Sequence, residues 1–236
     1  MPWVRELYDM GYNVYIPLQP YHGLNDRRGM ALNDLTAKSW PPSQLESVDI
    51  AQGLGKQVTV SGLSGGGTLA SWAAQERDDI ELTVPMAPFI GIKLVPGVLL
   101  NKGFTNLIQI LPNFYRWWDP IQKENNPASA PYSYVGYPFR SMGEYMLLGF
   151  SAMADAAQEA PAGAITMVIN PNETSISNAV AKQFVRDWQA HGDIQAELVE
   201  LPDELNLPHD FISVTRPGND PDVIYPILLP WLTGSN

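Results

Sequence analysis

The sequence has 236 residues, enough for one α/β domain with a hydrophobic core, and its 45% hydrophobic and 17% charged residues exclude a disordered chain. A net charge of −11 without a cluster of Lys or Arg excludes nucleic acid as an expected partner, because a phosphate backbone would be repelled. The absence of cysteine removes disulfides, thiolate metal sites and cysteine nucleophiles together.

Short runs of β-branched residues alternate with helical patterns along the chain, which is typical of a parallel sheet with crossover helices. In chain order we expect a helix over 3–10, a strand over 12–17, a helix over 42–51, a strand over 58–61, a helix over 68–76, strands over 82–85 and 165–169, a helix over 178–191, a strand over 196–201 and a helix over 223–232. The predicted fold class is therefore α/β, with a mostly parallel sheet flanked by helices.

The stretch 93–160 departs from this alternation and is rich in Pro, Gly and aromatic residues, including Trp117 and Trp118. An insertion that follows the carboxyl end of a strand lies where active sites form in open α/β sheets. We therefore predict an inserted helical cap or lid over a core of residues 1–92 and 161–236. A helical subdomain packed for stability alone is the alternative.

The apolar runs 89–100 and 224–232 are too short to span a bilayer, and both contain Pro. Arg5 and Glu6 lie where a signal peptide would have its apolar stretch. We expect a soluble, cytoplasmic protein without a transmembrane segment, and the sequence leaves its oligomeric state open.

Ser64 is at the centre of a Gly-x-Ser-x-Gly pattern that lies directly between the predicted strand 58–61 and the predicted helix 68–76. Nucleophilic chemistry uses a serine at the tip of such a sharp strand-to-helix turn, because the strained backbone exposes the hydroxyl. Gly62 and Gly66 fit this arrangement, since a Cβ would clash where strand and helix approach closely.

The helix that begins after Ser64 adds a favourable field for a developing oxyanion, and the N–H of Gly65 is the expected donor. A purely structural glycine turn is the alternative. A phosphate-binding loop is excluded, because no Lys-Ser or Lys-Thr follows the glycines.

These residues resemble the nucleophile elbow of the α/β-hydrolase superfamily. The stretch 11–17 with Tyr21, His22 and Gly23 is also similar to the strand and loop that precede the elbow in carboxylesterases and relatives of monoacylglycerol lipase. The similarity covers most of the chain outside 93–160. It implies hydrolysis of a small-molecule carboxylic ester through an acyl-enzyme, without a metal or organic cofactor, and the cap aromatics favour an apolar group on that ester.

The superfamily orders its triad as Ser, acid, His, and this chain has three histidines. His22 precedes Ser64 and is interpreted as structural or as lying near the entrance to the site, and His191 ends a predicted helix, where it complements the helix dipole. His209 follows the last strand, where the resemblance places the base. Its imidazole must be neutral to accept a proton, so activity should rise with pH as the ring loses its proton.

The acid should follow the strand 165–169, and Glu173 lies at the expected turn. Its role would be to hold the His209 tautomer and to stabilise the imidazolium. Asp203 and Glu204, close to His209 in sequence, are the alternatives, and an exposed loop position for Glu173 would remove it from the site.

Members of the superfamily carry a further strand and an oxyanion loop, often His-Gly, upstream of the first helix seen here. In this chain His22-Gly23 comes after the predicted strand 12–17, so it occupies the later loop. Two interpretations remain: an N-terminally truncated hydrolase that lacks its N-terminal strands, or a second oxyanion donor from elsewhere. A non-catalytic binding domain, or a serine peptidase or acyltransferase on the same fold, are the alternative functions.

Overall fold

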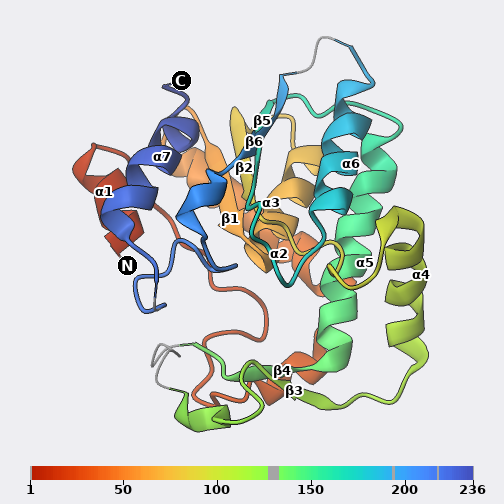
Figure 1. Cartoon of the computed structure of the whole chain (residues 1–236). Helices are drawn as coiled ribbons and strands as arrows, with labels where there is room; N and C mark the ends of the chain where they lie inside the picture. Colours follow the sequence, from red (N-terminus) through yellow and green to blue (C-terminus); the bar gives the residue numbers. More distant parts are fainter. Residues whose placement is uncertain (1, 127–132, 193–194, 217, 236) are drawn as a thin grey trace.

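The structure is a computed structural model that describes residues 2–126, 133–192, 195–216 and 218–235. Its centre is a four-stranded parallel sheet in the order β1-β2-β5-β6 (Figure 1). The strands are β1 (Thr59–Leu63), β2 (Leu82–Met86), β5 (Ala164–Ile169) and β6 (Ala196–Glu200). A separate antiparallel ribbon is formed by β3 (Tyr115–Trp117) and β4 (Gly136–Pro138).

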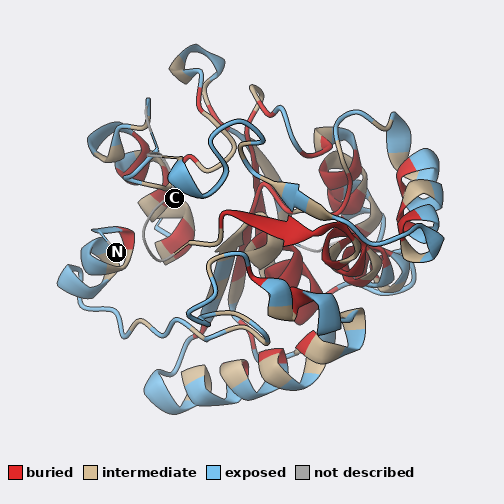
Figure 2. Ribbon diagram, turned by 90° about the horizontal axis from the view of Figure 1, so that it is seen from below, coloured by how far each residue is buried: buried red, intermediate tan, exposed pale blue. Residues whose placement is uncertain are grey.

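Helices cover both faces of the sheet, and their outer sides are exposed while the sides toward the sheet are buried (Figure 2). The α-helices are α1 (Pro2–Asp9), α2 (Trp40–Leu54), α3 (Gly65–Glu76), α4 (Gly97–Ile110), α5 (Phe139–Ala156), α6 (Asn178–Gln189) and α7 (Pro221–Thr233). The short 3-10 helices are η1 (Met30–Asp34), η2 (Ala37–Ser39), η3 (Lys123–Asn125) and η4 (Asp203–Leu205).

The two faces of β5 belong to two different hydrophobic cores. Ile165, Met167 and Ile169 pack with α2, α3, α5 and α6. Val168, on the opposite face, packs with α1 and α7. Because side chains alternate across a strand, a strand covered on both faces must be apolar at nearly every position, which fits β5, where Thr166 is the one polar residue.

The predicted α/β class with a mostly parallel sheet is confirmed, and the predicted helices and strands are found within a few residues of their expected ends, with one exception. The predicted strand over 12–17 is wrong, because this segment joins no ladder among the described residues. A hydrogen bond from Asn13 Nδ2 to the carbonyl oxygen of Leu54 (2.6 Å) links it to the end of α2. A strand pattern without a neighbouring strand has nothing to pair with.

The segment 93–160, predicted to be a cap, contains α4, β3, η3, β4 and α5, and its residues 127–132 lie outside the described part of the chain. The long helix α5 packs along α3, and α4 lies on its outer side (Figure 1). The buried side chains of α5, including Met146 and Phe150, belong to the same hydrophobic core as those of α3. The ribbon β3–β4 and η1 lie together beyond the carboxyl ends of the strands (Figure 1).

Among the described residues, no helix combines the length and the apolar character needed to cross a lipid bilayer.

Candidate active site

Ser64 occupies the turn between β1 and α3 with a backbone conformation that an L-residue rarely adopts, φ 57° and ψ −117°. The neighbouring main chain holds it there. The N–H of Ser64 donates to the carbonyl oxygen of Met86 (2.9 Å), and its own carbonyl oxygen accepts from the N–H groups of Thr68 (3.0 Å) and Phe89 (3.0 Å). Such strained residues persist only where the surroundings fix them, and they concentrate at functional sites.

The glycines around Ser64 have different roles. A Cβ on Gly62 would overlap the main chain of Gly66, and a Cβ on Gly67 would lie 2.8 Å from the carbonyl oxygen of Met86. A Cβ on Gly66 would meet nothing within 4 Å. The expected clash is therefore confirmed at Gly62 and wrong at Gly66, which contributes its main chain to the close approach, while Gly67 is the crowded glycine of the helix.

The N-terminus of α3 has no side-chain cap, because Ser64, at the N-cap position, makes no capping hydrogen bond. The first N–H groups of a helix have no partner within the helix, so the N–H of Gly65 is left for water or a ligand. Ser64 and Gly65 are both partly exposed. The turn thus combines an accessible hydroxyl with the positive end of a helix dipole.

Glu173 and His209 are joined by a hydrogen bond between His209 Nδ1 and Glu173 Oε2 (2.6 Å). Glu173 is in the loop after β5 and His209 in the loop after β6, although 36 residues separate them in the sequence. The side chain of Glu173 is 1% exposed and that of His209 22% exposed, so the pair runs from the interior to the surface. This arrangement orients the imidazole and leaves its Nε2 toward the accessible side.

The buried carboxylate of Glu173 is stabilised in its ionised form. Burial alone would raise the pKa of Glu173, but the hydrogen bond and the charge of His209, with the N–H groups of Ser175 and Ile176, outweigh it and lower the pKa below its usual value. Those two N–H groups donate to Oε1 at 2.7 Å and 3.3 Å. Glu173 therefore has a partner for each carboxylate oxygen.

Asn170, at the end of β5, connects the two loops and was not anticipated from the sequence. It is fully buried, and its Nδ2 donates to the carbonyl oxygens of Leu207 (2.8 Å) and Pro208 (3.2 Å), which directly precede His209. Its Oδ1 accepts from the N–H of Asn172 (3.0 Å), in the loop that carries Glu173. An Asn directly after a buried strand, before Pro-Asn-Glu, was the available signal.

The rival acids do not contact His209 in the described part of the chain. Asp203 and Glu204 are exposed on η4, and the main-chain oxygen of Asp203 accepts from Asn172 Nδ2 and from the N–H of Asn206. The histidines interpreted as structural lie elsewhere. His22 stacks on Tyr134 (5.7 Å between ring centroids), and Nε2 of His191 lies 2.7 Å from the carbonyl oxygen of Ala156.

Ser64, Glu173 and His209 all follow carboxyl ends of parallel strands, and those ends meet at one edge of the sheet (Figure 1). Within the described residues, the Ser64 hydroxyl and the His209 ring do not form a hydrogen bond with each other. Hydrogen bonds between catalytic groups are often long in proteins without substrate and tighten when it binds. The edge therefore carries the Ser64 hydroxyl and the oriented His209 imidazole on separate loops.

Solved structures of lipases share this architecture. A monoacylglycerol lipase from Paleococcus ferrophilus matches with a TM-score of 0.69 at 14% identity, over 100% of this chain and 88% of that one. A structure from a study of the metagenome-derived lipolytic enzymes LipS and LipT matches with a TM-score of 0.65 at 14% identity, over 98% and 86% of the two chains. A soluble variant of the Saccharomyces cerevisiae monoglyceride lipase, in complex with a substrate analog, matches with 0.57 at 16% identity, over 92% and 76%.

No protein-family model matches the sequence, and no curated protein matches it either. At identities this low the structural likeness establishes the fold alone: the chain has the α/β-hydrolase fold.

Proposed function

We propose that this chain, with its α/β-hydrolase fold, is a serine hydrolase that cleaves carboxylic esters, with Ser64 as nucleophile, His209 as base and Glu173 as the acid that orients it. The observation that carries the proposal is the conformation of Ser64, an L-residue held at φ 57° at an accessible turn by three main-chain hydrogen bonds. A purely structural turn would place glycine there without strain. The pairing of His209 with Glu173 at the same sheet edge adds the base that a serine nucleophile needs.

The proposed reaction has two halves. His209 takes the hydroxyl proton of Ser64 as its oxygen attacks the ester carbonyl, and the N–H of Gly65 donates to the resulting oxyanion. The alcohol leaves with the proton from His209, which gives the acyl-enzyme. Water then attacks that ester with His209 again as base, and release of the carboxylic acid restores the Ser64 hydroxyl.

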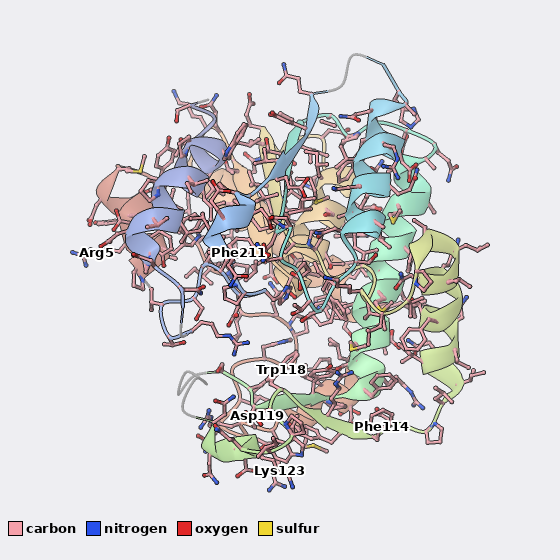
Figure 3. All side chains as sticks on the ribbon, in the orientation of Figure 1. Arg5, Phe114, Trp118, Asp119, Lys123 and Phe211 are labelled. Atoms are coloured by element: carbon pink, nitrogen blue, oxygen red, sulfur yellow. The ribbon has the colours of Figure 1, made fainter. Side chains whose placement is uncertain are left out.

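The substrate we expect carries an apolar group. Trp118 is 63% exposed and lies, in Figure 3, on the side of the β3–β4 region toward the sheet. Its ring packs on Tyr137 (4.4 Å between centroids), which fixes an aromatic surface beyond the carboxyl ends of the strands. The same proposal makes the segment 93–160 a lid over this site.

The test is hydrolysis of p-nitrophenyl acetate, butyrate and decanoate by the chain, with Ser64→Ala as the inactive control. Turnover that rises with acyl length and disappears in Ser64→Ala supports an esterase with an apolar acyl site. Labelling by a fluorophosphonate probe, followed by mapping of the modified peptide, should identify Ser64. A folded protein that neither turns over esters nor reacts with the probe would refute the enzyme.

A non-catalytic domain on the same fold is the second candidate, and one observation favours it: Ser64 and His209 are not hydrogen-bonded to each other among the described residues. A non-catalytic domain needs no activated serine. The probe separates the two candidates, because a binding domain with an unactivated Ser64 would remain unlabelled at probe concentrations that label a serine esterase.

A further inference from the structure

Tyr145 of α5 lies directly against Gly65, the residue that would donate to the oxyanion. A Cβ placed on Gly65 would lie 2.8 Å from Cε1 and 3.1 Å from Cζ of the Tyr145 ring. Since Cζ is the carbon that carries the hydroxyl, the polar end of Tyr145 is beside the N-terminus of α3. A side chain at residue 65 would displace this ring, so the glycine there leaves room for it.

The ring of Tyr145 is held in place by aromatic neighbours. The fully buried Trp40 packs on it at 4.2 Å between ring centroids, and Phe89 lies at 6.4 Å. Phe89 is also the residue whose N–H donates to the carbonyl oxygen of Ser64. Tyr145 and the Ser64 turn are thus positioned by the same segment of the chain, which makes the ring a fixed part of the site.

The hydroxyl of Tyr145 has no hydrogen-bond partner among the described residues, and it is not one of the buried polar atoms sealed from solvent there. Its oxygen is therefore not fully sealed from solvent. Burial of the ring raises the pKa of Tyr145 far above its usual value, so the hydroxyl keeps its proton and remains a donor. A fixed, protonated and unpartnered donor is what an oxyanion site requires.

The His22-Gly23 dipeptide comes after the segment 12–17 and not in an upstream oxyanion loop, so it is not the expected second donor. The His22-Gly23 dipeptide packs against Tyr134, near the β3–β4 ribbon, and Nδ1 of His22 lies 2.8 Å from the carbonyl oxygen of Pro20. We propose that the Tyr145 hydroxyl is the second oxyanion donor, acting together with the N–H of Gly65. This inference rests on the proposed function, and it assigns a role to a side chain on a helix rather than to an upstream loop.

The test is Tyr145→Phe, which keeps the ring and removes the hydroxyl. Loss of one oxyanion donor should lower kcat for p-nitrophenyl butyrate by about 10²–10³-fold and leave KM nearly unchanged. Inhibition by a trifluoromethyl ketone, which forms a tetrahedral adduct with the serine, should weaken in parallel, whereas inhibition by the product butyrate should not. An unchanged melting temperature would show that the fold is intact.

Tyr8→Phe is the control, because it also removes only a tyrosine hydroxyl, but Tyr8 is exposed on α1 and belongs to no part of the proposed site. It should leave kcat and the ketone affinity unchanged. Equal kcat in Tyr145→Phe and the unmodified chain would overturn the assignment of Tyr145 while leaving the esterase intact. An unmodified chain that hydrolyses no ester and takes no probe would overturn the proposed function and this inference together.

Discussion

The loops at the carboxyl edge of the sheet and the N-terminal segment 12–17 differ in how their main chains are held. Around Ser64 and Glu173, main-chain groups are tied to neighbouring strands and loops, as the hydrogen bonds of Ser64 with Met86 and Phe89 illustrate. In the segment 12–17, the N–H of Tyr12 donates to the carbonyl oxygen of Leu7, and no other main-chain group forms a hydrogen bond within the described residues. Both regions lie outside helices and strands, so irregular structure by itself does not indicate a weakly determined conformation. What matters is where the polar groups of the main chain find partners.

The largest expected effect comes from removing the charge of Glu173 at the carboxyl edge of the sheet. Glu173→Gln should lower kcat by roughly 10⁴-fold, the magnitude known for the equivalent change in a serine protease triad, because the amide no longer holds the His209 tautomer whose Nε2 can accept a proton. Ester turnover at neutral pH measures it. Asp203→Asn, on the exposed η4, is the control and should be nearly unchanged. If the two variants exchanged these outcomes, Glu173 would not be the acid.

A second test compares two glycines of the same turn. Gly62→Ala should cost about 3 kcal/mol of unfolding free energy and most of the activity, because its Cβ overlaps the main chain of Gly66. Gly66→Ala has free space and should keep the stability or raise it by up to about 1 kcal/mol, since alanine favours the helix. Urea unfolding of both variants gives the difference. Equal losses would contradict the close approach at Gly62.

Replacing one asparagine in each region compares how much each region contributes to the free energy of unfolding. Asn170→Ala leaves the buried carbonyl groups of Leu207 and Pro208 without their donor and should cost about 1–3 kcal/mol. Asn13→Ala removes an exposed hydrogen bond of the N-terminal segment and should change stability by less than about 0.5 kcal/mol. Chemical unfolding of the two variants decides. A cost at Asn13 as large as at Asn170 would mean that the segment 12–17 is held more firmly than its contacts indicate.

The smallest expected effect is the dependence of stability on acid. Because the pKa of Glu173 is lowered in the folded protein, its ionised form adds stability that is complete above the ordinary value of 4.5 and is lost as the pH falls through the lowered pKa. The difference in melting temperature between the unmodified chain and Glu173→Gln should therefore be constant at higher pH and shrink toward pH 3. A difference that grew in acid would contradict the direction of the shift.

The sequence predicted the elements whose cause is local and missed those whose cause is a distant contact. The pattern around Ser64 identified the turn, and the apolar run of β5 identified a buried strand with Glu173 after it. The segment 12–17 has the composition of a strand, but pairing depends on a neighbour that a local pattern cannot reveal. The order of the chain led to His209, and its hydrogen bond with Glu173 agrees with that choice.

Asn170 and Tyr145 were missed for the same physical reason. The bonds of Asn170 reach residues 37 and 38 positions away, and Tyr145 meets Gly65 only because α5 packs along α3. In the sequence, each is an ordinary residue of a loop or helix. Similarly, the pattern could not separate the free space at Gly66 from the crowding at Gly67, since the crowding comes from Met86 and Pro88, about 20 positions away in the sequence.

One consequence follows from the place of β1 at the rim of the sheet. Among the described residues, the strand that presents Ser64 pairs only with β2, so the hydrogen-bonding groups on its other side face away from the sheet. An extended peptide that paired with β1 would add a strand to the sheet and restrict the motion of the strand that precedes Ser64. Binding of such a peptide at that rim and binding of substrate at Ser64 would then be thermodynamically linked, each changing the affinity for the other by the same factor.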